Sequence, residues 1–200
     1  MSQAHRDYFN GLASEWDTMV EDLPVLREYL VRFGVLQGER ILDVGAGTGR
    51  LTKYLIELTG PEGCVFAEDI SEQMLIEAGK SIDSEKVRFV CDDVCALALK
   101  SDSFDKVICF SIFPHILHQQ RALNEIRRVL RPGGRLLILH TSSSHELNHF
   151  HASLKSVVCR DQLLPADEMV PLIRKAGLME RVIEESENLY WVEAEKPAKN

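Results

Sequence analysis

The sequence predicts an α/β fold in which a mostly parallel sheet is covered by helices on both faces. Short apolar runs alternate with stretches of helical periodicity along nearly the whole chain, the pattern of parallel strands joined by crossover helices. Turn residues such as GPEG and RPGG separate these runs. With 200 residues, 45% hydrophobic and 27% charged, the chain has the composition of one globular domain. We therefore predict a single Rossmann-like domain that spans residues 1–200.

Five apolar runs, each of ordinary strand length, predict the parallel part of the sheet. They lie at 40–44, 64–68, 87–91, 105–110 and 135–140. Near the end of the chain, 178–184 and 189–195 are separated only by the tetrapeptide ESEN. Two runs this close together favour an antiparallel pair, which we expect at one edge of the sheet.

The helices follow from apolar residues that share one face. Asp22 and Pro24 begin the first helix, and Gly34 ends it as a C-terminal cap. Three crossover helices are predicted at 49–58, 71–79 and 119–130. A last helix is expected over 167–176, where Pro171 is tolerated only in the first turn, because backbone N–H groups there lack helical partners.

The segment 141–166 departs from this alternation. It is polar, rich in histidine and without a clear strand. Segments of this kind on an α/β scaffold often carry substrate contacts. We predict that it forms a lid or substrate segment.

Composition narrows the class of partner. The 23 basic and 31 acidic residues give a net charge of -8, which argues against nucleic acid and against a membrane surface. No apolar run is long enough to span a membrane, and the first residues lack the apolar core of a signal peptide. The five cysteines are typical of reduced core thiols. We expect a cytoplasmic protein with a small-molecule ligand, either a monomer or a homodimer.

The strongest local signal is ILDVGAGTGR, in which a strand runs into closely spaced glycines. Glycine allows a ligand to approach the backbone. The spacing is G-x-G-x-G, whereas a dinucleotide fingerprint requires a glycine where Arg50 stands. Asp43 precedes the first glycine, and a carboxylate there would repel a pyrophosphate and attract a cation. The loop therefore disfavours a nicotinamide cofactor.

Together with VFAEDISEQML, FVCDDVCAL, SFDKVICFSIFPHI and LNEIRRVLRPGGRLLI, this loop resembles the class I S-adenosylmethionine-dependent methyltransferases. The resemblance covers roughly residues 5 to 196 and keeps the order of the family's motifs. It implies S-adenosylmethionine as the cofactor, S-adenosylhomocysteine as the product and a small-molecule methyl acceptor. The opening YFNGLASEWD resembles the segment that folds over the cofactor in small-molecule members, with Tyr8 and Trp16 as covering residues.

The resemblance also implies which residues hold the cofactor. Asp43 would contact the ammonium group of the methionine part, and Asp69 the ribose hydroxyls, with Glu68 as the neighbouring alternative. Asp93 would accept from the adenine amino group, while Val94 packs on the ring. The complete set implied is Asp43, Gly45, Ala46, Gly47, Asp69, Ile70, Met74, Asp93, Val94 and Phe110.

Six of the seven histidines lie between 115 and 151. The run His145-Glu146-Leu147-Asn148-His149 matches a zinc-binding pattern, but no acidic ligand follows at the expected spacing. We expect His115, His140 and His149 to converge at the acceptor as general base or positioning groups, since imidazole titrates near neutral pH. A metal held by the same three residues and a purely structural role are the alternatives.

The leading hypothesis is therefore transfer of a methyl group from S-adenosylmethionine to a small molecule by in-line displacement. The alternatives are a metal-dependent enzyme built on the histidine cluster and a module that binds the cofactor without turning it over. No segment carries a residue pattern specific for one acceptor. A metal is not expected.

Overall fold

The computed structural model describes residues 1–20 and 23–198. Its seven strands form one sheet in the order β3-β2-β1-β4-β5-β7-β6. The strands are β1 (Arg40–Val44), β2 (Cys64–Asp69), β3 (Val87–Cys91), β4 (Phe104–Phe110), β5 (Leu130–His140), β6 (Met179–Ser186) and β7 (Leu189–Glu195). Strands β1 to β5 run parallel, whereas β7 pairs antiparallel with both β5 and β6. The predicted parallel sheet with an antiparallel pair at its edge is confirmed.

The main difference in the sheet is the start of β5. The strand begins at Leu130 and runs through the RPGG sequence, five residues earlier than predicted. Leu130 pairs with Phe104, and a register shift between Phe104 and Lys106 absorbs the turn-like residues. A bulge of this kind keeps turn residues inside a strand pair, which a sequence pattern does not reveal.

The described residues form eight α-helices. Five of them lie where the sequence predicts a helix, whereas those over 3–12, 16–19 and 144–153 were not predicted. The eight helices are α1 (Gln3–Leu12), α2 (Trp16–Met19), α3 (Val25–Phe33), α4 (Thr52–Thr59), α5 (Glu72–Ser81), α6 (Gln119–Val129), α7 (Ser144–Ser153) and α8 (Ala166–Lys175). Short 3₁₀ helices are η1 (Ala13–Glu15), η2 (Phe113–His115) and η3 (Val157–Arg160). Gly34 ends α3 in the left-handed conformation, as expected. The predicted start at Asp22 lies outside the described residues.

The expectation for Pro171 is wrong. Helix α8 begins at Ala166, so Pro171 is the sixth residue and lies in the second turn. Proline has no N–H to donate to the carbonyl four residues earlier. Met169 and Ile173, which flank it on the apolar face of the helix, are fully buried in the core. Burial of this face offsets the lost hydrogen bond, so tertiary packing overrides the local cost.

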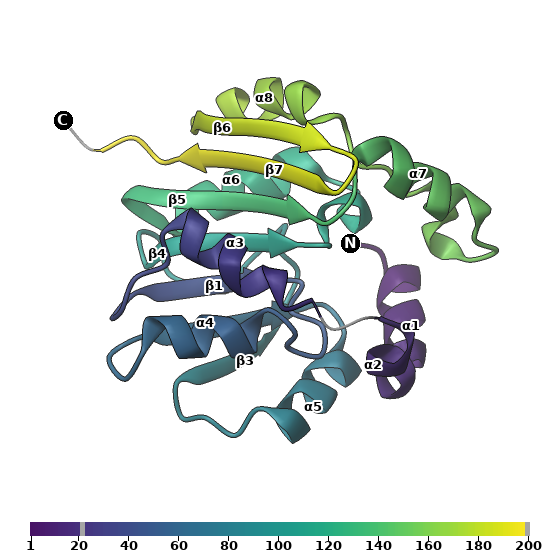
Figure 1. Ribbon diagram of the computed structural model, residues 1–200, viewed down its shortest axis with the longest axis horizontal. Helices are drawn as coiled ribbons and strands as arrows, with labels where there is room; N and C mark the ends of the chain where they lie inside the picture. The colour runs from purple at the N-terminus through teal and green to yellow at the C-terminus, as the bar shows by residue number, and fades with distance from the viewer. Residues whose placement is uncertain (21–22, 199–200) are drawn as a thin grey trace.

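Helices cover the sheet from both sides (Figure 1). Leu30 and Phe33 of α3 and Leu55 of α4 pack on one face together with Trp191 of β7. The apolar residues of α6 and α8 pack on the opposite face. Helices α1, α2 and α7 lie beyond the carboxyl ends of the parallel strands, where ligands bind in open α/β sheets (Figure 1).

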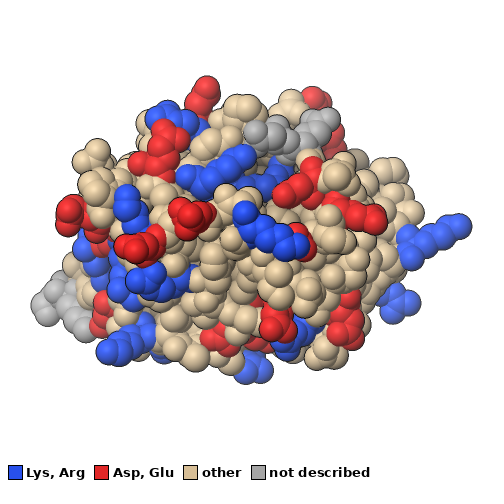
Figure 2. Space-filling model, turned by 90° about the horizontal axis from the view of Figure 1, so that it is seen from below, with Lys and Arg blue, Asp and Glu red and all other residues tan. Residues whose placement is uncertain are grey.

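The surface in Figure 2 carries basic and acidic side chains that are interspersed, without a continuous basic area on that face. Such a mixture does not provide the basic stripe that neutralises nucleic-acid phosphates. Within residues 1–20 and 23–198, every helix is too short or too polar to cross a bilayer.

Candidate active site

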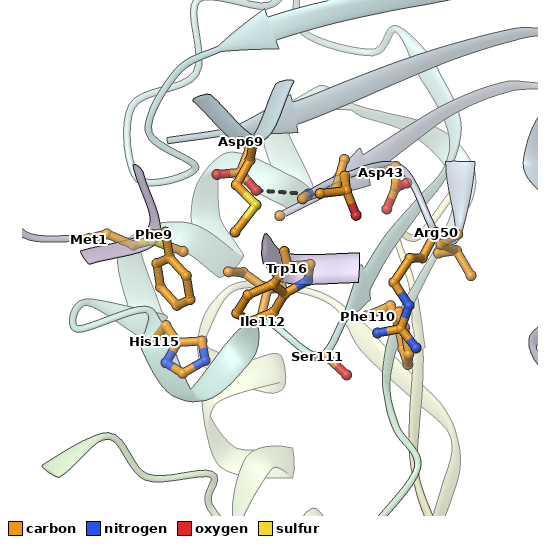
Figure 3. Close-up of a pocket in the computed structure, with 16 residues that line it drawn as sticks. Met1, Phe9, Trp16, Asp43, Arg50, Asp69, Phe110, Ser111, Ile112 and His115 are labelled. Atoms are coloured by element: carbon orange, nitrogen blue, oxygen red, sulfur yellow. Dashed lines mark hydrogen bonds between the residues drawn. The ribbon is translucent and has the colours of Figure 1, made fainter. Parts of the chain in front are cut away.

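A pocket opens at the carboxyl ends of β1, β2 and β4 (Figure 3). Its empty volume is about 650 Å³, counting the part that is open to solvent. The lining residues are Met1, Phe9, Trp16, Asp43, Gly45, Ala46, Gly47, Thr48, Arg50, Leu51, Asp69, Met74, Phe110, Ser111, Ile112 and His115. Seven of the ten residues expected to hold the cofactor are in this set: Asp43, Gly45, Ala46, Gly47, Asp69, Met74 and Phe110.

The glycine turn after β1 needs glycine for two different reasons. Gly45 has a φ of 68°, and a Cβ atom built there would lie 2.3 Å from Cγ1 of Ile112. Gly47 has a φ of 56°, but a Cβ atom there would meet no atom within 4 Å. Gly45 is therefore required by close packing against Ile112 as well as by its backbone conformation. Gly47 is required by its conformation alone, and it leaves room for a ligand.

Asp69, the last residue of β2, connects the glycine turn after β1 to the end of β2. Its carboxylate accepts a hydrogen bond from the Gly47 N–H at 2.9 Å, drawn in Figure 3, and one from the Ser71 N–H at 2.8 Å. The side chain is 6% exposed and lines the pocket. Each carboxylate oxygen has a second lone pair, so Asp69 keeps acceptor capacity for a ligand.

Three buried carboxyl groups gather at these strand ends. Burial, opposed in part by a hydrogen bond from Thr52, raises the pKa of Asp43 to about 7. Burial and the neighbouring Asp69 raise the pKa of Glu68 well above its ordinary value. Burial also raises the pKa of Asp69. No lysine or arginine among the described residues forms an ion pair with any of the three. This edge of the sheet therefore favours a cationic ligand.

The remaining three expected cofactor residues do not line the pocket. Asp93 accepts hydrogen bonds from the Met1 ammonium at 3.2 Å and from the Cys95 N–H at 3.0 Å. Burial alone raises the pKa of Asp93, but these two donors outweigh it and hold the pKa below its ordinary value. Val94 is buried in the core. Ile70 is half-buried at the end of β2.

Aromatic residues from the N-terminal helices close the pocket on one side. Phe9 of α1 and Trp16 of α2 both line it, with ring centroids 5.9 Å apart in an edge-to-face arrangement. Tyr8 packs on Phe9 with centroids 5.3 Å apart, but it does not line the pocket. Of the two aromatic residues expected to cover the site, the structure places only Trp16 there. Phe9 could have been found from its place in the same opening segment.

The three expected histidines do not converge. His115, in η2, lines the pocket, with Phe9 beside it (Figure 3). His140, at the end of β5, is 2% exposed and outside the lining, and its Nε2 has no hydrogen-bond partner within the described part of the chain. Burial, with His115 and His151 nearby, lowers the pKa of His140 to about 3. His149 is exposed on α7. The histidine that joins His115 is instead His151, with ring centroids 5.1 Å apart.

The zinc-like pattern on α7 does not form a site. Ser143 caps the helix, and both His145 and His149 are exposed. Across residues 1–20 and 23–198, no group of three or more histidine, cysteine or acidic side chains is arranged to hold a metal ion.

Sequence reasoning missed Asp161, the residue after η3. Its buried carboxylate lies 2.7 Å from Nδ1 of His115 and 3.0 Å from Nε2 of His5. Nδ1 of His151 lies 3.1 Å from the backbone oxygen of Asp161. No local signal marks these four residues as a group, because they come from α1, η2, α7 and the end of η3.

Comparison with known proteins agrees with the geometry of the pocket. Residues 42–138, which include the glycine turn, Asp69 and His115, match a family model described as a methyltransferase domain. The chain belongs to the class I S-adenosylmethionine-dependent methyltransferases. It is 35% identical over 146 residues to the ubiquinone/menaquinone biosynthesis C-methyltransferase UbiE of Pseudomonas fluorescens, and the match covers 68% of this chain and 57% of that protein. The chain therefore spans less than two thirds of the length of this relative.

Solved structures share the fold of this methyltransferase domain. An S-adenosylmethionine-dependent methyltransferase from Aquifex aeolicus superposes with a TM-score of 0.73 at 22% identity, over 88% of this chain and 94% of that one. The cyclase SpnF superposes with a TM-score of 0.72 at 18% identity, over 87% and 80%. Since a cyclase shares the architecture, the fold by itself does not define the reaction.

Proposed function

We propose that the protein transfers the methyl group of S-adenosylmethionine to a small-molecule acceptor. The observation that carries the proposal is the group of buried carboxyls at the pocket, Asp43, Glu68 and Asp69, which has no cationic partner within the described residues. Burying unpaired carboxyl groups costs stability, so they mark a site that binds a positive charge. S-adenosylmethionine carries an ammonium and a sulfonium group, whereas a nicotinamide dinucleotide brings an anionic pyrophosphate.

The residues of the pocket fit this molecule. The turn from Gly45 to Gly47 would hold its methionine part, with Asp43 close to the ammonium group. Asp69 would accept from the ribose hydroxyls with its remaining lone pairs. Asp93 and Val94 are proposed for the adenine, Asp93 after exchanging the Met1 ammonium for the adenine amino group. When bound, S-adenosylmethionine supplies an electrophilic methyl group, and the protein's task is mainly alignment.

We propose His115 as the base that receives a proton from the acceptor. It is the histidine in the pocket lining, and its Nε2 has no hydrogen-bond partner among the described residues. His140 and His149 are not proposed for this role, because one is buried outside the pocket and the other is exposed on α7.

For the acceptor we propose a hydroxylated aromatic ring. The name of the Pseudomonas fluorescens relative assigns it C-methylation in ubiquinone and menaquinone biosynthesis. Phe9, Trp16 and Ile112 provide an apolar wall against which such a ring would pack. Loss of a phenolic proton raises the electron density of the ring carbons, so a base at His115 suits this class.

The segment 141–166 is proposed to close the acceptor side together with α1. Val158 of η3 packs on Phe9 and Met74, so the segment already contacts the wall of the pocket. The five cysteines are unpaired, which favours a reducing compartment such as the cytoplasm.

Native mass spectrometry of the full chain tests the proposal, with S-adenosylmethionine added in the presence and absence of a chelator. We expect a mass increase of one nucleoside that the chelator does not remove. A second assay follows S-adenosylhomocysteine with 1,4-naphthohydroquinone as the acceptor. Binding without turnover would leave a cofactor-binding module, and a chelator-sensitive metal adduct without nucleoside binding would overturn the proposal.

A further inference from the structure

Asp161 is the meeting point of three histidines from separate parts of the fold. Its carboxylate contacts His115 at 2.7 Å and His5 at 3.0 and 3.1 Å, and its backbone oxygen contacts His151 at 3.1 Å. The side chains of Asp161 and His5 are 3% and 4% exposed, and that of His115 is 12% exposed. No lysine or arginine pairs with this carboxylate among the described residues.

The hydrogen bonds fix where the protons are. A carboxylate and a carbonyl only accept, so each ring nitrogen that contacts Asp161 carries a hydrogen. His115 is then protonated on Nδ1, and His5 on Nε2. Burial by itself raises the pKa of Asp161, but the hydrogen bonds from His115 and His5 outweigh it and hold the pKa below its ordinary value. The carboxylate therefore stays ionised at neutral pH.

The two rings on the carboxylate differ in what their second nitrogen does. Nδ1 of His5 lies 2.6 Å from the hydroxyl of Ser2, so both of its nitrogens are occupied inside the protein. Nε2 of His115 has no partner in the described structure, and the residue lines the pocket. His115 is therefore the ring that can exchange a proton with a ligand, whereas His5 only donates a hydrogen bond to the carboxylate.

We propose that Asp161 is a positioning residue that holds His115 in the tautomer with a bare Nε2 directed to the acceptor, and that His5 supports it from α1. The proposal rests on the proposed methyl transfer for its use of the pocket. The acceptor O–H proton moves to Nε2, and the resulting imidazolium is stabilised by the ionised Asp161 through Nδ1–H. As the ring carbon bonds to the methyl group, the bond between that methyl and sulfur would break, and the sulfur would leave as the thioether of S-adenosylhomocysteine. The hydrogen on the methylated ring carbon would then return as a proton to the phenolate oxygen, and the proton on Nε2 would leave to solvent, so that one net proton is released.

This arrangement selects a class of acceptor. A bare Nε2 assists only an acceptor that has a proton to lose, such as a phenol or another hydroxyl. It gives no advantage to a thioether or a tertiary amine, which reacts without losing a proton. The structure therefore favours protic acceptors.

The tautomer is measurable without the acceptor. Long-range ¹H–¹⁵N correlation spectra of the full chain, labelled with ¹⁵N-histidine, distinguish the two ring nitrogens, and His115→Gln assigns the signals. We expect wild-type His115 to carry its hydrogen on Nδ1. In Asp161→Asn the carboxylate is lost, and the Nε2–H form should become the major one. His151→Gln, which removes the neighbouring ring and its contact to the backbone oxygen but keeps the Asp161 carboxylate, is the matched control and should leave the tautomer unchanged.

If wild-type His115 carries its hydrogen on Nε2, the proposal is wrong. This measurement uses the wild-type protein, so it does not depend on whether Asp161→Asn folds. An unchanged tautomer in a folded Asp161→Asn protein overturns it as well. Binding of S-adenosylhomocysteine is measured on the same samples and should be equal in wild type and Asp161→Asn. Absence of that binding in wild type would refute the proposed function and leave the tautomer result intact.

With 1,4-naphthohydroquinone as the substrate, the same variant should lower kcat about 10- to 100-fold. KM should change less than about twofold, because Asp161 acts through His115 and does not line the pocket. A rise in KM at constant kcat would show that Asp161 only shapes the pocket, and it would contradict the proposal.

Discussion

The two sides of the pocket are built in different ways. On the side that we propose for the cofactor, called the cofactor side, the Gly47 N–H and the Asp69 carboxylate are 22 residues apart in the sequence and meet across two adjacent parallel strands. On the side that we propose for the acceptor, called the acceptor side, His5 and Asp161 are 156 residues apart, and His115 and Asp161 are 46 apart. The cofactor side depends on backbone N–H groups and on glycine conformations. The acceptor side depends on side chains from unconnected helices.

The difference explains why one side leaves a motif and the other does not. A backbone conformation with positive φ restricts the residue type at one position, so Gly45 and Gly47 are visible in the sequence. A contact between side chains that are far apart in the chain does not restrict the residue types next to either of them, so it leaves no local motif. Substitutions on the cofactor side should therefore act strongly and locally, and exposed residues near the acceptor side should tolerate change.

The largest effect is expected from Gly45→Ala. The new Cβ would lie 2.3 to 2.7 Å from three Ile112 atoms in a backbone with a φ of 68°. Left-handed strain and overpacking together should lower the free energy of unfolding by about 2–5 kcal/mol, measured by urea denaturation. Gly47→Ala is the matched control, because it has the strain without the close contact, and it should cost about 1–2 kcal/mol. Equal losses in the two variants would show that Ile112 moves aside.

Asp69→Ala should weaken binding of S-adenosylmethionine about 10- to 100-fold, because two ribose hydrogen bonds to a charged group are lost. Isothermal titration calorimetry measures the dissociation constant. Asp83→Ala removes an exposed carboxyl of the same type and should leave the constant unchanged. An unchanged dissociation constant for Asp69→Ala would remove Asp69 from the cofactor site.

Affinity for S-adenosylmethionine should depend on pH through Asp43. A cationic ligand favours the ionised carboxylate, but below the raised pKa of about 7 Asp43 is protonated before binding. Binding should therefore strengthen as pH rises through 7, with an affinity at pH 8 about tenfold that at pH 6 if one proton is released. Calorimetry in buffers of different ionisation enthalpy measures that proton. If affinity does not change with pH, the positive charge of the ligand lies away from Asp43. The Asp43→Asn variant should show a smaller dependence of affinity on pH than the wild-type protein.

The smallest effect is expected from the pair of histidines on α7. His145→Ala combined with His149→Ala changes two exposed side chains, so the free energy of unfolding should stay within about 0.5 kcal/mol of wild type. Binding of S-adenosylmethionine should not change. Thermal unfolding with added Zn²⁺ gives a second comparison. A zinc-dependent rise in melting temperature that the double variant abolishes would restore the metal-site interpretation.

The sequence alone determined the sheet and the order of its elements, and it predicts the edge of the sheet at which we propose that the cofactor binds. Alternating apolar runs and helical stretches predict an α/β fold, because the spacing of buried residues is set by the strand or helix in which they lie. The turn after β1 and the carboxyl at Asp69 follow from local constraints, and both line the pocket. The same local signals predict Asp93 and Val94 at the adenine. Neither residue lines the pocket, and their role stays a prediction.

Only the tertiary structure decided the acceptor side. Sequence position grouped His115 with His140 and His149, but helical phase turns His149 to solvent, and His140 is buried outside the pocket lining. Packing of α1 and η3 around the pocket brings in His5 and Asp161 instead. Residues that meet through the packing of separate elements share no spacing in the chain. Their contacts are set by the geometry of the whole fold, and no local pattern records them.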